Sequence, residues 1–169
     1  TLPLSRLHAM ARLACLVVPL FPLAARLRCE PELKEEALAI LAGNGAAARV
    51  VAANRRARRA GLKPGMSLPQ ARALLPKLKA RAPDPVCERA AQEALLEVAE
   101  RFSPRVEDAG LGTVFLEIGE RSTLARRFPG PDPELEMARA LLLAAERVEL
   151  PARAGVAATK LAAKLAAGL

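Results

Sequence analysis

The sequence predicts an α+β fold, built from short apolar strands and amphipathic helices in the order β-α-β-β-α-α-α-β-α-β-α. The first observation behind this prediction is a set of apolar runs of four to six residues, which are typical of buried strands. The second is a pair of longer segments, 84–102 and 133–147, in which apolar residues recur at helical spacing. With 169 residues and 52% apolar content, the chain can bury a core as one domain or two small ones.

Three apolar runs in the first third of the chain are predicted strands: 14–18, 38–41 and 49–53. The first run lies in the segment 13–25, which resembles a secretion signal, but Pro19 and Pro22 interrupt it and it is too short to span a membrane. We therefore favour a buried strand, preceded by an N-terminal extension over 1–12. The turn Gly43-Asn-Gly45 favours a hairpin between the second and third strands.

Capping residues predict where the short helices begin. A first helix is expected over 22–28. Asn54 can cap the next helical turn through its side-chain oxygen, and Gly61 stands where that turn should end. Ser67 and Gln70 form a capping box, which predicts a further helix directly after them.

The second half of the chain contains the two strongest helix predictions. In the helix 84–102, six apolar residues share one face: Val86, Ala90, Ala94, Leu95, Val98 and Phe102. In the helix 133–147, four residues are spaced for burial: Leu135, Ala138, Leu142 and Ala145. Strands are expected at 113–118 and 152–157, and the last helix, 158–167, presents Lys160 and Lys164 one turn apart.

Positive charge is concentrated between Arg49 and Arg81, where the chain has ten Lys and Arg residues and no Asp or Glu. The rest of the chain has 16 basic and 18 acidic residues, so the net charge of +8 comes from this segment alone. The predicted strand and helices hold these cations on a folded scaffold. Such a basic block is expected where a protein neutralises phosphates.

Other residue types argue against several kinds of site. Trp and Tyr are absent and there are only four Phe, which argues against base stacking on aromatic side chains as the main binding mode. Cys15, Cys29 and Cys87 show no CxxC spacing, so each is expected to be a buried small apolar residue. His8, the only histidine, has no catalytic or ligand partner in the sequence.

A motif with fixed spacing runs through the basic segment: Ala53-Asn54, Ala57-Arg58, Gly61-Leu62, Gly65-Met66, Ala71, Leu74 and Pro76. Further matches follow it: Phe102-Ser103, Val106-Glu107, 110–117, Ala154-Gly-Val156, Lys160 and Lys164. Over about residues 13–169 the chain thereby resembles the N-terminal half of the Y-family, or translesion, DNA polymerases.

This resemblance implies an α+β palm with an inserted, small fingers subdomain. The palm is expected to have a mixed, mostly antiparallel sheet with helices on one face. Its implied strands are 14–18, 113–118 and 152–157, and its implied helices are 84–102 and 133–147. The implied domains are a palm strand at 13–21, fingers at 22–77 and the remaining palm at 78–169, without the thumb and little finger of the family.

The positions of the family's metal-binding acids hold other residues here: Val17, Pro19, Gly112 and Thr113. Nucleotidyl transfer uses carboxylates that hold two Mg²⁺ ions, and none of these side chains is a carboxylate. We therefore expect no catalytic residue, no metal site and no cofactor. An active polymerase would need Mg²⁺ and would have to rebuild the site from Glu107, Asp108 and Glu117.

The resemblance also implies which cations meet phosphate. Arg58 matches a residue that contacts the incoming triphosphate, and Lys164 matches a palm lysine near it. We predict phosphate or nucleotide binding by four residues: Arg55, Arg58, Arg59 and Lys164. We predict DNA binding by four others: Arg72, Lys77, Lys79 and Lys160. The competing interpretation is a solvated basic surface without a bound partner.

Loss of the acids with retention of the basic segment most resembles the ImuB-type mutagenesis accessory proteins. That resemblance implies a non-catalytic DNA-binding adaptor in translesion synthesis and the SOS response, whose partners are an error-prone replicative polymerase and the sliding clamp. We expect weak DNA binding, no membrane association, and a place in the bacterial cytoplasm at the nucleoid. Two alternatives stay open: an active distributive translesion polymerase with relocated metal ligands, and a protein-interaction module without DNA contact.

Overall fold

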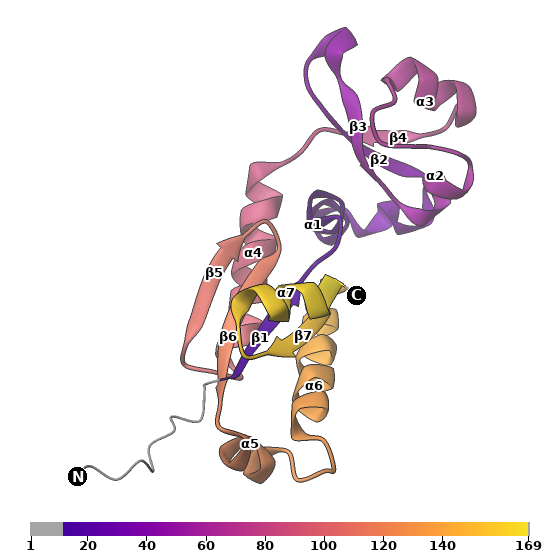
Figure 1. Cartoon of the computed structure of the whole chain (residues 1–169). Helices are drawn as coiled ribbons and strands as arrows, with labels where there is room; N and C mark the ends of the chain where they lie inside the picture. Colours follow the sequence, from indigo (N-terminus) through magenta and orange to yellow (C-terminus); the bar gives the residue numbers. More distant parts are fainter. Residues whose placement is uncertain (1–11, 169) are drawn as a thin grey trace, which may run out of the picture. The chain divides into compact units, whose positions relative to one another are not determined.

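The computed structural model describes residues 12–168, which form two compact units (Figure 1). Of these described residues, the larger unit contains 12–19 and 92–168, and the smaller unit is Leu20–Ala91. The smaller unit thus contains the whole segment 22–77. Of the expected N-terminal extension, only Arg12 lies within the described residues. Within 12–168, no helix is long and apolar enough to cross a membrane.

The larger unit is built on a four-stranded antiparallel sheet. In spatial order its strands are β5 (Val106–Gly110), β6 (Thr113–Gly119), β1 (Arg12–Val17) and β7 (Arg153–Ala157). Val17 on β1 lies opposite Thr113 on β6 and opposite Arg153 on β7. Because β1 and β6 are largely covered on both faces, their sequences are nearly continuous apolar runs.

One face of this sheet is covered by α7 (Lys160–Gly168). Ala163 and Ala167 of this helix pack against Cys15 and Phe115 of the sheet. Gly155 on β7 permits this close packing, because a Cβ atom there would lie 2.2 Å from the Ala163 carbonyl oxygen. Small residues therefore set the distance between helix and sheet.

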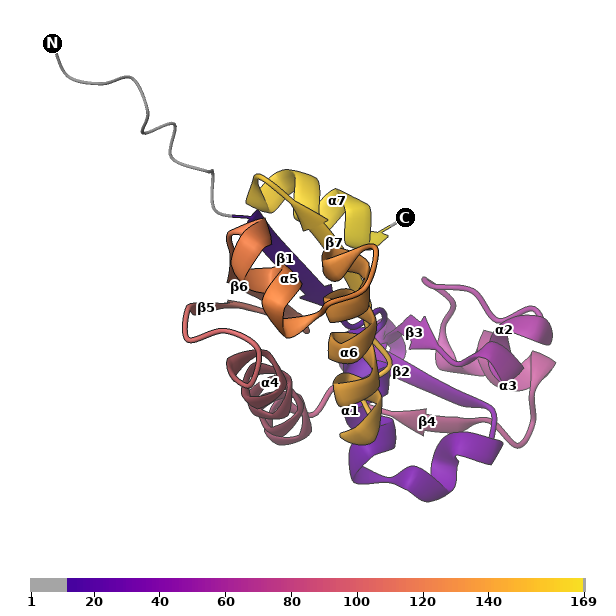
Figure 2. The same cartoon turned by 90° about the horizontal axis from the view of Figure 1, so that it is seen from below.

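The opposite face is covered by α6 (Pro133–Arg147) and by the part of α4 (Pro85–Glu100) that belongs to the larger unit (Figure 2). The short helix α5 (Arg121–Arg127) precedes α6. The prediction that 84–102 and 133–147 cover one face of the sheet is confirmed. α7 on the other face was not part of that prediction.

The smaller unit has a three-stranded mixed sheet in the order β3 (Arg49–Ala53), β2 (Leu38–Ala42) and β4 (Lys79–Arg81). β2 pairs with β3 as the predicted antiparallel hairpin, and with β4 in parallel. The parallel pairing of the fold thus lies in this sheet and not in the larger one. Its helices are α1 (Phe21–Cys29), α2 (Arg55–Arg59) and α3 (Leu68–Leu74).

Two apolar clusters hold the smaller unit together. One joins the sheet to α2 and α3 and consists of Ala39, Leu41, Val50, Ala53, Ala57, Leu62, Ala71 and Leu78. The other joins it to α1 and a 3₁₀ turn at Pro31–Glu35, and consists of Leu23, Leu33, Leu38, Ile40 and Ala52. β2 contributes to both clusters, which explains why its residues are apolar on both sides.

The predicted caps are present. The Asn54 side chain accepts a hydrogen bond from the Ala57 backbone N–H, and Ser67 with Gln70 forms the complete capping box. β4, β5 and α5 were not predicted, and their sequences explain why. β4 has three residues, β5 is mostly exposed, and α5 buries only Leu124, so none shows a clear apolar period.

The buried faces of two helices differ from the predicted ones. In α4, Val86 is 74% exposed, whereas the buried apolar residues are Cys87, Ala91, Ala94, Leu95, Val98 and Ala99. In α6, Leu135 is 45% exposed, and the buried residues are Pro133, Met137, Leu141 and Ala145. Alanine and leucine occur around most of each helix, so the spacing fits several faces and tertiary packing selects one.

Candidate nucleic-acid interface

Asn54, at the end of β3, sets the position of α2. Its Oδ1 accepts hydrogen bonds from the backbone N–H groups of Ala57 (3.0 Å) and Leu38 (3.2 Å), and its Nδ2 donates to the Glu36 carbonyl oxygen (2.6 Å). One side chain therefore joins the start of β2, the end of β3 and the first turn of α2. Ala57 is the only buried residue of α2, so the four arginines of that helix are directed outward.

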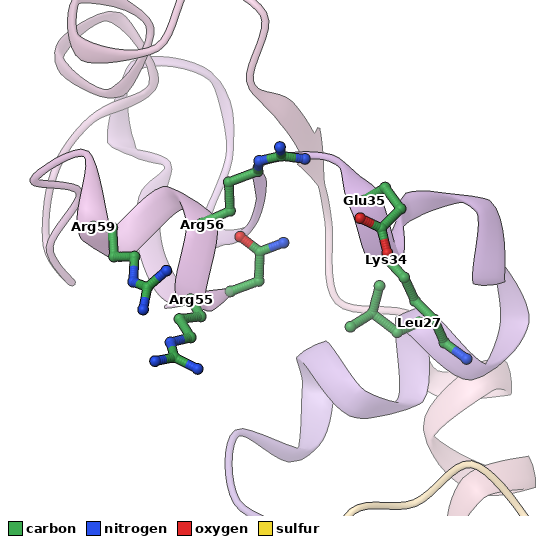
Figure 3. A pocket seen from close by; sticks show the side chains of 7 residues that line it. Leu27, Lys34, Glu35, Arg55, Arg56 and Arg59 are labelled. Atoms are coloured by element: carbon green, nitrogen blue, oxygen red, sulfur yellow. The ribbon is translucent and has the colours of Figure 1, made fainter.

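Three of these arginines border a pocket of about 500 Å³ in the smaller unit. The pocket is lined by Leu27, Lys34, Glu35, Asn54, Arg55, Arg56 and Arg59. Figure 3 shows Arg55 and Arg59 pointing to the same side of α2, and Arg56 extending toward the turn that carries Glu35. Four cations and one carboxylate give the pocket a positive potential, which suits an anion such as phosphate.

The structure therefore brings Arg55 and Arg59 together but does not place Arg58 in this pocket, although Arg58 is exposed on the same helix. Two of the lining cations, Lys34 and Arg56, were not predicted as site residues. Arg56 belongs to the same run of arginines and could have been included on that basis. Lys34 is distant in sequence, and only the 3₁₀ turn at Pro31–Glu35 brings it here.

A second basic groove of about 470 Å³ lies elsewhere in the smaller unit. It is lined by Glu36, Arg72, Pro76, Lys77, Leu78 and Lys79. Three of the four predicted DNA-binding residues are thus neighbours in one groove, contributed by α3, the following loop and β4. The parallel pairing of β4 with β2 brings Glu36, which precedes β2, to the same groove.

The predicted lysines of α7 lie in the larger unit and differ in their surroundings. Lys160 forms an ion pair with Glu107 and lies over the Phe115 ring, with its Nζ 5.9 Å from the ring centroid. Lys164 is exposed. Burial raises the pKa of the Cys15 thiol to about 11, and the positive charge of Lys164 partly opposes this shift.

The four positions that the family resemblance assigns to metal-binding acids come together at one end of the larger sheet. Val17 and Thr113 are opposite each other, and the Val18 backbone N–H donates to the Gly112 carbonyl oxygen at 2.8 Å. The side chains there are apolar, absent or a buried hydroxyl. Since Mg²⁺ binds through carboxylate oxygens, this donor set does not fit a magnesium ion.

The three carboxylates that a relocated metal site would need are already engaged by other groups of the larger unit. Glu107 pairs with Lys160, and a carboxylate oxygen of Glu117 is 3.1 Å from a guanidinium nitrogen of Arg105. Asp108 accepts hydrogen bonds from Gln92 (2.7 Å) and from the Gly110 N–H (2.8 Å). Among the residues that the structure describes, no group of three or more His, Cys, Asp or Glu could hold a metal ion.

A buried amide, that of Gln92, secures the backbone at this end of the sheet. Its Nε2 donates to Asp108 and, at 3.2 Å, to the Thr113 carbonyl oxygen, and its Oε1 accepts from the Gly112 N–H at 2.8 Å. Gln92 is 9% exposed. Neutral hydrogen bonds therefore hold the backbone of Gly112 and Thr113, where the family resemblance would place charged metal ligands. Sequence reasoning missed this residue because a glutamine within a helix carries no distinctive pattern.

A family model described as the impB/mucB/samB family matches residues 17–168. The chain belongs to this family. No curated protein sequence gives a significant match. The likeness to solved structures concerns the fold, because the sequence identities are about 20%.

Solved structures that resemble this impB/mucB/samB chain include Y-family DNA polymerases. An insertion ternary complex of Dbh DNA polymerase has a TM-score of 0.74 at 20% identity, covering 93% of this chain and 45% of that one. A post-insertion binary complex of Dbh has a TM-score of 0.76 with the same identity and coverage. DinB from Sulfolobus solfataricus has a TM-score of 0.71, again at 20% identity with 93% and 45% coverage. The chain therefore has the palm and fingers fold and spans less than half the length of these structures.

Proposed function

We propose that this impB/mucB/samB chain is a non-catalytic, DNA-binding relative of the Y-family polymerases that acts as an adaptor in translesion synthesis. One observation supports the proposal: at the positions that the family resemblance assigns to metal-binding acids, this palm has Val17, Pro19, Gly112 and Thr113, while the fingers present a basic surface. Two-metal nucleotidyl transfer requires carboxylates at those positions. Without them the fold retains binding surfaces but lacks the groups that activate the reaction.

The engaged acidic residues support the same conclusion. A relocated metal site would need two or more of Glu107, Asp108 and Glu117 to turn toward one ion. Glu107 and Glu117 would then leave their ion pairs with Lys160 and Arg105, and Asp108 would leave Gln92. A metal ion would therefore have to displace an ion pair or a hydrogen bond at each of these three carboxylates.

The basic surface supports a DNA partner. The pocket beside α2 and the groove beside α3 each collect cations from separate elements of one folded unit. Cations held on a rigid scaffold bind phosphates with less loss of side-chain freedom than cations on a disordered tail. By family resemblance we further propose a role in the SOS response at the bacterial nucleoid, with an error-prone replicative polymerase and the sliding clamp as protein partners.

The catalytic part of the proposal is tested by primer extension and by calorimetry with Mg²⁺ and Mn²⁺, with Dbh DNA polymerase as the positive control. We expect no nucleotide incorporation and no saturable metal binding. A micromolar site that is lost in Glu107→Gln or Glu117→Gln, together with incorporation, would establish the active polymerase with relocated ligands instead.

The DNA-binding part is tested with the variant Arg55→Ala/Arg58→Ala/Arg59→Ala. We expect weaker binding to every DNA sequence and a shallower salt dependence, since each lost phosphate contact removes about one unit from the log–log slope. A matched control removes the same charge from exposed arginines of the larger unit: Arg121, Arg126 and Arg139. This control should keep most of the affinity and the original slope.

Equal effects of the two triple variants would mean that net charge matters and the α2 surface does not. Unchanged affinity and slope in the α2 variant would show that these arginines do not touch phosphate. The remaining hypothesis would then be a protein-interaction module, whose partner presents an acidic surface.

A further inference from the structure

The end of α1 and the start of α4 are held side by side within the smaller unit. Arg26 donates from Nη2 to the Ala82 carbonyl oxygen at 2.9 Å, and its Nη1 is 3.5 Å from a carboxylate oxygen of Asp84. Glu30, just past the end of α1, is 3.0 Å from the guanidinium Nε of Arg81. These contacts fix two segments that are far apart in the sequence.

Two cysteines stand at this junction. Cys29 is the last residue of α1 and is exposed, which differs from the expected burial of all three cysteines. Cys87 lies in the first turn of α4 and is 8% exposed. Its backbone N–H donates to Asp84, which caps the helix, and its thiol is near enough to Cys29 for that neighbour to help raise its pKa.

We propose that Cys29 and Cys87 form a peroxide-sensitive thiol pair, which oxidises to an intramolecular disulfide within the smaller unit. The proposal concerns a modification site and is independent of the proposed function. The contacts of Arg26 with Ala82 and Asp84, and of Glu30 with Arg81, supply the geometry, because they hold the end of α1 against the start of α4. A disulfide needs the sulfur atoms at about 2.05 Å, which these two thiols can reach by side-chain rotation and a small local approach of the two segments.

The exposed thiol reacts first. Hydrogen peroxide oxidises Cys29 to a sulfenic acid and is itself reduced to water. The sulfur of Cys87 then attacks the Cys29 sulfur, so that the S–S bond forms, the S–O bond breaks, and the hydroxyl leaves as water with the Cys87 proton. The complete reaction consumes one peroxide and two thiols and yields one disulfide and two waters.

The surroundings of Cys87 assign it the second step. Burial, the hydrogen bond with Cys29 and the negative charge of Asp84 raise the pKa of Cys87 to about 12. At neutral pH it is therefore a thiol, which peroxide oxidises slowly, because the thiolate is the reactive form. Cys15 is buried in the larger unit. It serves as an internal reference that should stay reduced.

The disulfide would close a loop that contains β2, β3, β4, α2 and α3. It would join the two segments through which the chain enters and leaves the smaller unit, at Leu20 and Ala91. A cross-link of this kind stabilises mainly by restricting the unfolded chain. Oxidation should therefore stabilise the basic unit without altering its arginine surface.

The test is treatment of the reduced chain with a small excess of hydrogen peroxide, followed by alkylation of free thiols and non-reducing peptide mapping. We expect one peptide pair, joined through Cys29 and Cys87, an alkylated Cys15, and complete reversal by a dithiol reductant. The oxidised chain should also unfold at a higher urea concentration than the reduced chain.

Two variants supply controls. Cys29→Ser changes an exposed residue and should abolish both the cross-link and the urea shift, whereas Cys15→Ser should change neither. Recovery of Cys29 and Cys87 as separately alkylated or over-oxidised residues would overturn the proposal. A disulfide only between two chains would do the same, because the thiols would not meet within one molecule.

Discussion

Replacement of Gln92 by Met should destabilise the larger unit, although the two side chains have similar size. The change removes three hydrogen bonds, which join the amide to Asp108, the Thr113 carbonyl oxygen and the Gly112 N–H. Gly112 and Thr113 are buried, so water cannot easily replace the lost partners. An orphaned buried backbone group costs about 1–3 kcal/mol. The bond to exposed Asp108 adds little, and we expect a total loss of about 2–3 kcal/mol.

Urea unfolding followed by circular dichroism measures this loss, since the chain has no Trp or Tyr for fluorescence. With a urea dependence of about 2 kcal/mol per molar, the midpoint should fall by about 1–1.5 M. Glu93→Met is the matched control, because it places the same side chain at the next, exposed position of α4. Its stability should stay within about 0.5 kcal/mol of the wild type.

The variant Gln92→Glu separates the effect of the lost hydrogen bonds from the effect of side-chain volume, because glutamate has nearly the size of glutamine. A carboxylate can still accept from the Gly112 N–H, but it cannot donate to Asp108 and adds a like charge beside it. The pKa of one carboxyl group should then be raised in the folded state, so the variant should regain stability as pH falls from about 7 to 5. If Gln92→Met moves the midpoint by less than about 0.3 M, the amide network does not secure this end of the sheet.

Two further predictions concern the packing of α7 and the cap of α4. Gly155→Ala should lower the free energy of unfolding by about 2–3 kcal/mol, because the new Cβ would meet backbone atoms of α7 at 2.2 and 2.3 Å. The control Gly168→Ala, whose Cβ would meet no atom within 4 Å, should be nearly neutral in the same urea assay. The pKa of Asp84 is lowered by hydrogen bonds from the Cys87 and Val86 N–H groups and by the charge of Arg26. The contribution of Asp84 to stability is therefore present above about pH 4 and is lost as the pH falls through the pKa of the folded state. The melting temperatures of the wild type and Asp84→Asn should therefore differ most at neutral pH and converge in acid; a constant difference would contradict the pKa shift.

The sequence by itself determined those features that depend on neighbouring residues. Asn54 and the Ser67–Gln70 capping box each satisfy backbone N–H groups within three residues, so their structural effect is local. The motif around Arg58 has fixed spacing, which identified the family, and the absence of acids at Val17 and Gly112 can be read directly from the chain. The adjacency of those two positions followed from the fold prediction and agrees with the pairing of β1 with β6.

Only the tertiary structure decided which side chains meet across long separations. It selected the buried faces of α4 and α6, because their apolar residues allow several. It joined Lys34 to the arginines of α2 while leaving Arg58 out of that pocket, and it placed Gln92 beneath the β5–β6 turn. It also brought the end of α1, which carries Cys29, beside the start of α4, which carries Cys87. In each case the partner lies on another helix or strand. The contact therefore depends on how strands pair and helices pack, which local sequence patterns do not predict.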